Sequence, residues 1–406
     1  MEFTNFKGDN ARMGFQLRNT HVSYANTLRR LILTGVEMVG FRADMTSAGT
    51  TTDVDVQTND TPMTNEMLAH RIGLLPIMEK EPKKWNPDKY IFRLEVEGED
   101  EAVKDITATD FEIYEVQSGG SEPVKIPTGR FFPPNKITGS TCLIATLMPS
   151  VGGIRQKIKL IAKATVGTGR ENARFIPTSQ CTYEYTRDTD QERIDDIFMK
   201  WVISNKKAPG VNLMKDRVNS DDKDELDREK QEYKTLMKEF NTMEIARCYL
   251  MDEKGEPYSF DFIVESTGIL DATYIIKTAC EVGEAMCARY VHIDMGELPE
   301  DVSVSPADCQ MVGFDFIFRN HDYTLGNLLQ TWLVQNHIEG NAEPKITFAG
   351  MKIPHPLRDE MLLRIGADTE DIARKAIAAA CRGCTEMFRQ MKLSFMKGLS
   401  EAVSSK

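Results

Sequence analysis

The chain has 406 residues with 62 acidic and 50 basic side chains, which gives a formal net charge of −12 at pH 7. This length predicts roughly two to three domains, and the negative charge argues against direct, sequence-specific contact with nucleic acid, whose phosphates would repel the molecule. Eight scattered cysteines indicate free thiols in a reducing compartment, and we find neither a run of about 18 apolar residues nor a charged-then-apolar leader, so we expect an intracellular protein without a membrane span.

The N-terminal part predicts a strand at Met13 to Arg18 and a helix from Val22 to about Leu33, because apolar residues alternate in the first and recur every three or four residues in the second. A mostly extended stretch from Met38 to Val56 follows. Thr64 then predicts the N-cap of a second helix that ends near Gly73. Its expected inward side chains are Met67, Leu68 and Ile72.

From Lys80 to Tyr185 the sequence changes to short β-like runs separated by Gly and Pro, which indicates a β-rich insert. The runs are Tyr90 to Val96, Phe111 to Val116, Cys142 to Leu147 and Ile154 to Val166.

Two helices are expected after the insert. Thr189 with Glu192 predicts a capping box for the first helix. Its apolar face is Ile194, Ile197, Phe198, Trp201 and Val202. The second helix is expected from Asp222 to Leu250, behind an acidic first turn that suits the helix dipole. Its apolar positions are Tyr233, Leu236, Phe240 and Met243.

A strand with Phe260, Phe262 and Val264 on one face and a helix from Asp271 to about His292 come next. The stretch Asp294 to Asp308 carries five acids, two prolines and no Lys or Arg, which predicts a solvated linker.

One strand-to-helix unit occurs at both ends of the chain, at a fixed offset of 301 residues. Gly14 to Leu28 aligns without gaps to Asp315 to Leu329, and both strands end in Arg-Asn. A later helix also has a counterpart 101 residues further on, in which Ala279, Cys280 and Met286 match Ala380, Cys381 and Met387. A chain that carries one unit twice favours a pseudo-twofold dimer made of itself.

The expected fold class is therefore α+β, with two dimerisation domains that form an intramolecular pseudo-dimer and a β-rich insert that interrupts the first. The expected boundaries are 1–50 and 240–293 for the first dimerisation domain, 51–185 for the insert, 186–239 for a helical elaboration, 294–310 for the acidic linker and 311–406 for the second domain.

Several segments resemble the α-like subunits of DNA-directed RNA polymerase. Val22 to Arg30 is similar to their signature helix, Ala69 to Pro76 to the second signature of the larger, third-subunit or archaeal D type, and Gly167 to Pro177 to the loop that closes its insert. Thr324 to Leu329 and Phe348 to Leu357 resemble the smaller, eleventh-subunit or archaeal L type. The two types are separate chains in the family and look fused here, an arrangement similar to that in polymerases of large DNA viruses.

The resemblance implies a non-catalytic assembly platform that pairs its two α-like halves and docks the second-largest and largest polymerase subunits, with small zinc-ribbon subunits as further partners. No cofactor is expected in this chain, and magnesium is expected in the large subunits. Met78 to Tyr90 lacks the cysteine cluster that many larger members carry at this point, so we expect no metal there. The implied location is the nucleus or the cytoplasmic virus factory of an infected cell, and packaging in the virion is left open.

The expected subunit-interface residues are Tyr24, Asn26, Leu28, Arg29, Arg30, Leu31, His70, Arg71, Leu325, Asn327, Leu329, Trp332, Lys352 and His355. Asn26 and Asn327 suit polar contacts across the pseudo-twofold axis. Arg29 and Arg30 have no counterpart in the second copy, so they suit the face that meets the large subunits. A local cap or a solvated helix face is the alternative for each polar residue.

Two other classes of function fit parts of the sequence. A DNA sliding-clamp-like processivity factor is also acidic and repetitive, but its repeats would tile the chain evenly. A thiol or metal enzyme would use Cys381 and Cys384, although this CxxC lies in an amphipathic helix that favours buried thiols. We find no P-loop, G-x-S-x-G, H-E-x-x-H or closely spaced aspartates for magnesium, which favours a non-catalytic chain.

Overall fold

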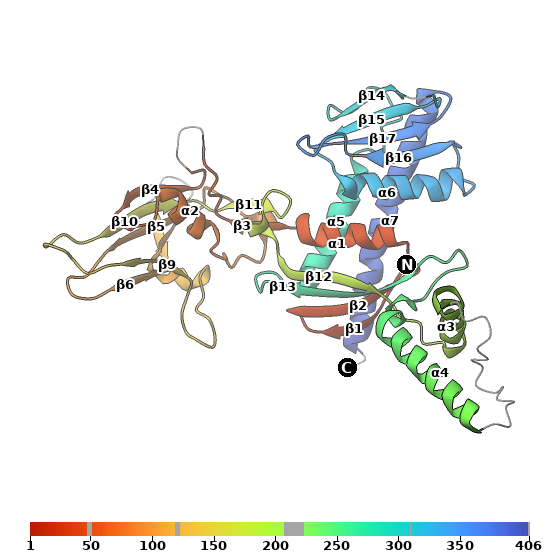
Figure 1. The fold of residues 1–406 in the computed structure, drawn as a ribbon. Coiled ribbons are helices and arrows are strands. Elements are labelled where there is room, and N and C mark those ends of the chain that lie inside the picture. Colours follow the sequence, from red (N-terminus) through yellow and green to blue (C-terminus); the bar gives the residue numbers. More distant parts are fainter. Residues whose placement is uncertain (47–50, 118–121, 207–222, 309, 405–406) are drawn as a thin grey trace.

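The computed structural model describes residues 1–46, 51–117, 122–206, 223–308 and 310–404. Helices and antiparallel sheets form an α+β fold, in which a β-rich insert stands away from a larger body (Figure 1). Two helices, α5 (Ala272–Ala288) and α7 (Glu370–Ser404), run side by side through that body. Within the described ranges no helix combines the length and the apolar composition needed to cross a membrane.

The first repeat domain is a four-stranded sheet in the order β1-β2-β13-β12, packed against α1 (Val22–Thr34) and α5. Its strands are β1 (Glu2–Gly8), β2 (Arg12–Arg18), β12 (Thr178–Tyr185) and β13 (Ser259–Ser266). The alternation in β13 sets its two faces: Phe260 and Phe262 are buried, whereas the intervening Asp261 accepts a hydrogen bond from Gln16 of β2 (2.9 Å).

The second repeat domain has the same topology. Its sheet order is β14-β15-β17-β16, and α6 (Tyr323–Leu333) and α7 follow its second and fourth strands along the chain, as α1 and α5 do in the first repeat domain. A π-helical turn, η6 (Val334–Ile338), extends α6. The strands are β14 (Val302–Pro306), β15 (Phe314–Arg319), β16 (Phe348–Lys352) and β17 (Glu360–Gly366).

The repeated Arg-Asn pair ends β2 and β15 in one backbone conformation. Asn19 has a φ of 56° and Asn320 a φ of 58°. This left-handed region is one that Asn enters more readily than most residues with a Cβ, since its short amide can bond to the nearby backbone. The sequence repeat is therefore a repeat of structure as well.

The insert has a core of its own beneath a five-stranded sheet in the order β4-β10-β5-β7-β8, next to α2 (Asn65–Gly73). Its strands are β3 (Glu37–Gly40) paired with β11 (Thr165–Thr168), β6 (Lys104–Thr107) paired with β9 (Leu143–Leu147), and β4 (Val54–Asn59), β5 (Tyr90–Glu97), β7 (Glu112–Glu115), β8 (Val124–Ile126) and β10 (Lys157–Ala162) in the large sheet. Short 3-10 turns occur at η1 (Pro82–Lys84), η2 (Ala108–Asp110), η3 (Thr128–Arg130) and η4 (Ala173–Phe175).

The capping of α2 follows the sequence prediction. The Thr64 hydroxyl accepts a hydrogen bond from the backbone N–H of Met67 (3.3 Å), and Leu68 and Ile72 are buried. Met67 itself is 57% exposed, so its expected inward position is wrong.

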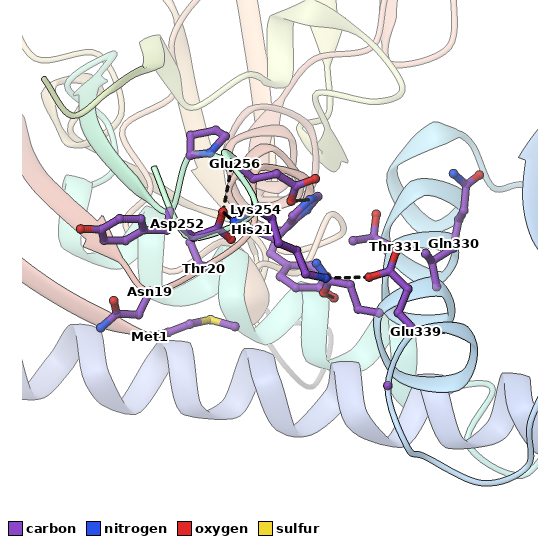
Figure 2. Close-up of a pocket in the computed structure, with 16 residues that line it drawn as sticks. Met1, Asn19, Thr20, His21, Asp252, Lys254, Glu256, Gln330, Thr331 and Glu339 are labelled. Carbon is purple, nitrogen blue, oxygen red and sulfur yellow. Dashed lines mark hydrogen bonds and ion pairs between the residues drawn. The ribbon is translucent and has the colours of Figure 1, made fainter. Parts of the chain in front are cut away.

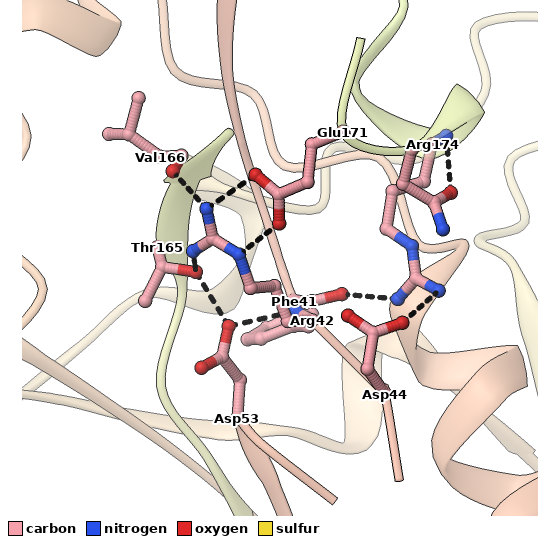
Figure 3. A network of polar contacts seen from close by, with 9 residues as sticks. Phe41, Arg42, Asp44, Asp53, Thr165, Val166, Glu171 and Arg174 are labelled. Atoms are coloured by element: carbon pink, nitrogen blue, oxygen red, sulfur yellow. Dashed lines mark hydrogen bonds and ion pairs between the residues drawn. The ribbon is translucent and has the colours of Figure 1, made fainter. Parts of the chain in front are cut away.

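A polar network holds the insert at its root, where β3 pairs with β11 (Figure 3). Arg42 donates from Nη2 to the Glu171 carboxylate (2.8 Å). Hydrogen bonding to Arg42 holds the pKa of Glu171 below its ordinary value. The nearly buried Arg174 donates to the backbone oxygen of Phe41 (2.8 Å). Residues of the Gly167 to Pro177 segment thus hold the two chain segments together at the root of the insert.

The helices α3 (Gln191–Lys206) and α4 (Lys223–Met243) form a hairpin with a small core of its own. The core residues are Phe198, Val202, Leu236, Phe240 and Cys248, with Ile194, Ile197, Trp201 and Tyr233 packed against them. The apolar faces expected from the sequence are therefore largely the faces that the hairpin buries.

Three details of this hairpin differ from expectation. Asp190, not Thr189, accepts from the backbone N–H of Glu192 (3.1 Å), so the predicted capping box is wrong. Met243 is 70% exposed and ends α4, well before Leu250, and a separate turn, η5 (Ile245–Arg247), follows. The expected start at Asp222 lies outside the described residues, as do the side chains of the acidic first turn.

Three expected domain boundaries also need correction. β12 pairs with β13 in the first repeat domain, so the insert ends before residue 178 and not at 185. The helical elaboration does not end at 239, because α4 continues to Met243 and the hairpin core includes Cys248. The linker expected at 294–310 contains β14, which pairs with β15. The run Val302 to Ser305 alternates Val with Ser as strands do, but it is only four residues long and lies among the acids and prolines that predicted a linker.

Candidate functional site: the seam between the two repeat domains

The repeat domains meet along a seam in which α5 packs against α7 and α1 packs against α6. Gly283 of α5 lies between Leu31 of α1 and Phe388 of α7. A Cβ at Gly283 would lie 2.8 Å from the ring of Phe388 and 2.9 Å from Leu31, so only glycine allows this contact. The seam therefore joins residues of both repeat domains in one core.

Six of the predicted interface residues lie in or against this shared core. They are Tyr24, Leu28, Leu31, Leu325, Leu329 and Trp332. The Tyr24 hydroxyl donates across the seam to the Gln335 side chain (2.8 Å), and the ring centroids of Tyr24 and Trp332 are 6.2 Å apart. Burial raises the pKa of Tyr24, so its hydroxyl remains a donor at neutral pH.

The C-terminal part of α7 extends from the second repeat domain over the sheet of the first. Phe395 of α7 has no exposed surface and packs among three aromatic rings of β1 and β2. Its ring centroid lies 5.4 Å from that of Phe3, 5.7 Å from that of Phe6 and 6.0 Å from that of Phe15. This cluster is a second apolar contact between the repeat domains.

Polar contacts border the seam at the N-terminus of α6. Arg30 of α1 donates to the Thr324 hydroxyl (2.8 Å) and to the Asp322 carboxylate (3.1 Å), and Asp322 caps α6 by accepting from the Thr324 N–H (2.7 Å). The expectation that Arg30 faces the large subunits is therefore wrong, because its guanidinium is bonded to the other repeat domain. Burial would raise the pKa of Asp322, but the bonds from Thr324 and the charge of Arg30 outweigh it and lower the pKa.

Replacing this cap tests the polar border. We expect Asp322→Asn to reduce the free energy of unfolding by about 0.5 kcal/mol at pH 7, because the charge paired with Arg30 is lost, whereas the amide oxygen of Asn can still accept the capping hydrogen bond. The folded-state pKa lies below the ordinary value of 3.8, so the carboxylate stabilises the fold above that pH and its contribution is lost as the pH falls through the folded-state pKa. Urea unfolding at pH 7 and near pH 3 should show the difference between wild type and variant shrinking at the lower pH. A difference that is the same at both pH values would contradict this role.

Asn26 and Asn327 do not meet across the seam. The Asn26 side chain accepts from Nε of Arg29 on the same helix (3.0 Å), and Asn327 is exposed. The expected polar contact across the axis is therefore wrong, and the Asn26 amide bonds instead within one turn of its own helix.

Four further predicted residues lie outside the seam. His70 and Arg71 are exposed on α2 of the insert, where Arg71 donates to the backbone oxygen of Leu143 (3.1 Å). Lys352 and His355 are exposed at the end of β16 and in the loop after it. These residues lie on outer surfaces, so they take no part in pairing the repeat domains.

Arg29, another predicted interface residue, lines a surface hollow together with Asn26. The hollow of about 660 Å³ lies between α1 and β12. Its lining includes Asn26, Arg29, Tyr183, Tyr185 and Arg187. In the part of the chain that the structure describes, no carboxylate is paired with Arg29. This face therefore presents two arginines, two tyrosine rings and the Glu184 carboxylate at the surface.

A polar cluster where the chain passes between the repeat domains was not anticipated from the sequence. The Tyr290 hydroxyl donates to the Asp301 carboxylate, and Nε2 of His321 lies 2.7 Å from the same hydroxyl. Burial lowers the pKa of His321, which favours the neutral ring. Because the Tyr290 hydroxyl gives its one proton to Asp301, the tautomer with the proton on Nε2 of His321 fits this contact. Arg289 completes the cluster through an ion pair with Asp301 (3.0 Å). Asp301 stood out only as one acid of the expected linker, so no local signal marked it.

A second hollow opens at the seam itself and is lined by both repeat domains (Figure 2). It has a volume of about 680 Å³. Lys254, in the loop before β13, reaches Glu339 beyond η6 (2.8 Å), and His21 lies 3.2 Å from Glu256. Nδ1 of His21 accepts from the Ser23 N–H (3.1 Å), so this ring also caps α1. These polar side chains are used in contacts within the chain.

Comparison with known proteins adds to this geometry. The RNA polymerase Rpb3/Rpb11 dimerisation domain matches residues 314–393, from β15 into α7. Subunit 3B of DNA-directed RNA polymerases IV and V from Arabidopsis thaliana is 24% identical over 294 residues, which cover 66% of this chain and 83% of that protein. Subunit RPAC1 of DNA-directed RNA polymerases I and III from Mus musculus is 24% identical over 310 residues, 70% of this chain and 81% of that protein. These matches support the interpretation of this chain as an α-like RNA polymerase subunit. DNA-directed RNA polymerase subunit Rpo3 from Methanobrevibacter smithii is 25% identical over 174 residues, which cover 42% of this chain and 53% of that protein.

The cysteines of this chain do not suit a thiol enzyme. Cys381 and Cys384 are buried in α7, and burial raises the pKa of both thiols well above the ordinary value. The thiolate is the nucleophile and the metal ligand, so this environment disfavours both roles. Across the described ranges, no three His, Cys, Asp or Glu side chains are grouped so that they could hold a metal ion.

Proposed function

We propose that this α-like subunit joins the larger and the smaller member of the α-like pair in one chain, as in polymerases of large DNA viruses, and acts as a non-catalytic assembly platform. The observation that carries the proposal is the duplicated topology, two sheets of equivalent strand order paired through α5 and α7. The dimerisation-domain match lies in the second repeat domain, and the subunit 3 and RPAC1 relatives match 66% and 70% of the chain, more than one repeat domain alone comprises.

In this proposal the platform docks the second-largest and largest polymerase subunits, and small zinc-ribbon subunits are further partners. The hollow at Arg29 is the proposed docking face, because it lies on α1, beside the seam, and presents a guanidinium without a paired carboxylate in the described chain. The platform would need no cofactor, since magnesium would belong to the large subunits. It would work in the nucleus or in the cytoplasmic virus factory of an infected cell.

Co-expression with the two large subunits of the same polymerase tests the platform. We expect the tagged chain to capture both, and Arg29→Glu to weaken capture at least about tenfold, because it places a like charge against a partner selected by the guanidinium. Arg93→Glu, which changes an exposed arginine of the insert, is the matched control and should capture normally. Failure of the wild-type chain to capture either large subunit would refute the platform.

A further inference from the structure

A hairpin at the end of the insert carries apolar side chains into solvent. This insert tip comprises residues 148–156, where Val151 is 81% and Ile154 is 78% exposed. Met148 of the tip is 51% exposed. Val103, which directly precedes the first residue of β6, is 56% exposed. Solvated hairpin tips usually carry Gly, Asn, Asp or Ser, and grouped exposed apolar side chains indicate an interaction surface.

The insert tip has a defined conformation. Gly152 and Gly153 have φ values of 63° and 80°, which only glycine adopts easily in succession and which match a tight hairpin turn. The backbones of Val151 and Ile154 exchange two hydrogen bonds of 3.2 Å. Arg155 forms a two-point ion pair with Asp100, with a distance of 2.8 Å from Nε. Because the apolar side chains are held in place, binding through them would cost little conformational entropy.

The insert tip lies far from the seam. β10 begins at Lys157, directly after the tip, and its other end leads to β11, which pairs with β3 at the root of the insert. The tip is thus at the end of β10 that points away from the body (Figure 1). No contact with the repeat domains accounts for Val151 and Ile154 in the described structure.

The charges around the insert tip restrict its partner. Four exposed carboxylates lie in residues 97–101, at Glu97, Glu99, Asp100 and Glu101. Arg155 is paired with Asp100, and Nζ of Lys104 donates to the backbone oxygen of Glu97 (3.1 Å), so the loop keeps an acidic excess. The four carboxylates of residues 97–101 form an acidic collar beside the tip. Nucleic acid and anionic lipid repel such a collar, whereas an apolar pocket with basic side chains around it attracts it.

We propose that the insert tip docks into an apolar, basic-rimmed pocket of one of the two large polymerase subunits, an inference that rests on the proposed function. A protein that handles nucleic acid carries basic surface, which matches the collar. The α-like subunit then holds its large partners at two separate points, the Arg29 hollow and the insert tip.

The test uses the full chain co-expressed with both large subunits. A photo-crosslinking amino acid at position 151 should attach to a large subunit, whereas the same residue at position 137, an exposed isoleucine of another insert loop, should not. The double variant Val151→Ser with Ile154→Ser should weaken capture at least about tenfold, and so should Glu99→Lys with Glu101→Lys, while Ile137→Ser leaves capture unchanged.

The possible results distinguish the assembly platform from the docking of the insert tip. If the wild-type chain captures no large subunit, the platform and the tip docking fail together. If capture is normal in both double variants and position 151 gives no crosslink, the tip docking alone is overturned. Self-association of the purified chain, or its flotation with phosphatidylcholine vesicles, that disappears in the Val151→Ser, Ile154→Ser variant would assign the tip to a second copy or to lipid and would also overturn it.

Discussion

Leu28→Asp and Leu329→Asp are each expected to lower the free energy of unfolding by about 4 kcal/mol or more, enough to unfold a chain of ordinary stability. Both leucines have no exposed surface and belong to the core that the two repeat domains share. An aspartate at either position would be buried without a partner for its charge. Thermal melting of the purified chain, followed by circular dichroism, should show a large drop in the melting temperature.

Leu393→Asp is the matched control for these variants. Leu393 lies on α7, but its side chain is largely exposed, so the same substitution should change the free energy of unfolding by no more than about 0.5 kcal/mol. Wild-type melting of Leu28→Asp or Leu329→Asp would mean that α1 and α6 do not form the shared core.

Phe395→Ala should remove about 3 to 5 kcal/mol of stability, because it leaves a cavity among rings that the two repeat domains contribute together. Phe395 belongs to α7, whereas Phe3, Phe6 and Phe15 belong to the first repeat domain. Guanidinium unfolding would measure the loss. Limited proteolysis should then cut the C-terminal end of α7 sooner than in the wild type.

Met396→Ala provides the comparison for Phe395. Met396 is the next residue on α7 and is exposed, so its truncation should cost less than about 1 kcal/mol. Equal losses in the two variants, or protection of the α7 end in Phe395→Ala, would show that the Phe cluster does not hold the repeat domains together.

Local features of the fold could be predicted because their physics is local. The cap formed by Thr64 and the alternation of Phe260 and Phe262 depend on residues only a few positions apart. The repeated turn at Asn19 and Asn320 is also local, so the copy at one end of the chain could be found from the other. The capping box at Thr189 failed because Asp190, the next residue, supplies a competing carboxylate that accepts from the same Glu192 N–H.

The partners of polar side chains could not be predicted in this way. Arg30 and Arg29 are adjacent and chemically alike, yet Arg30 is bonded to Asp322 of the other repeat domain while Arg29 lines an open hollow. A rotation of about 100° per residue around α1 separates the two environments, and only the position of α6 decides which arginine meets an acid. Tyr290, Asp301 and His321 likewise come from separate segments, and only the fold brings them within hydrogen-bonding distance.

By itself the sequence determined that one structural unit occurs twice, that a β-rich insert divides the first copy, and which leucines lie in the core. These features follow from periodicity and backbone preference, which each segment carries on its own. Tertiary structure alone decided that β14 is a strand rather than linker, that β12 belongs to the first repeat domain, and that Asn26 and Asn327 lie apart. Strand pairing and polar contacts between distant segments depend on which groups the fold brings within hydrogen-bonding distance, and no short stretch of sequence contains that information.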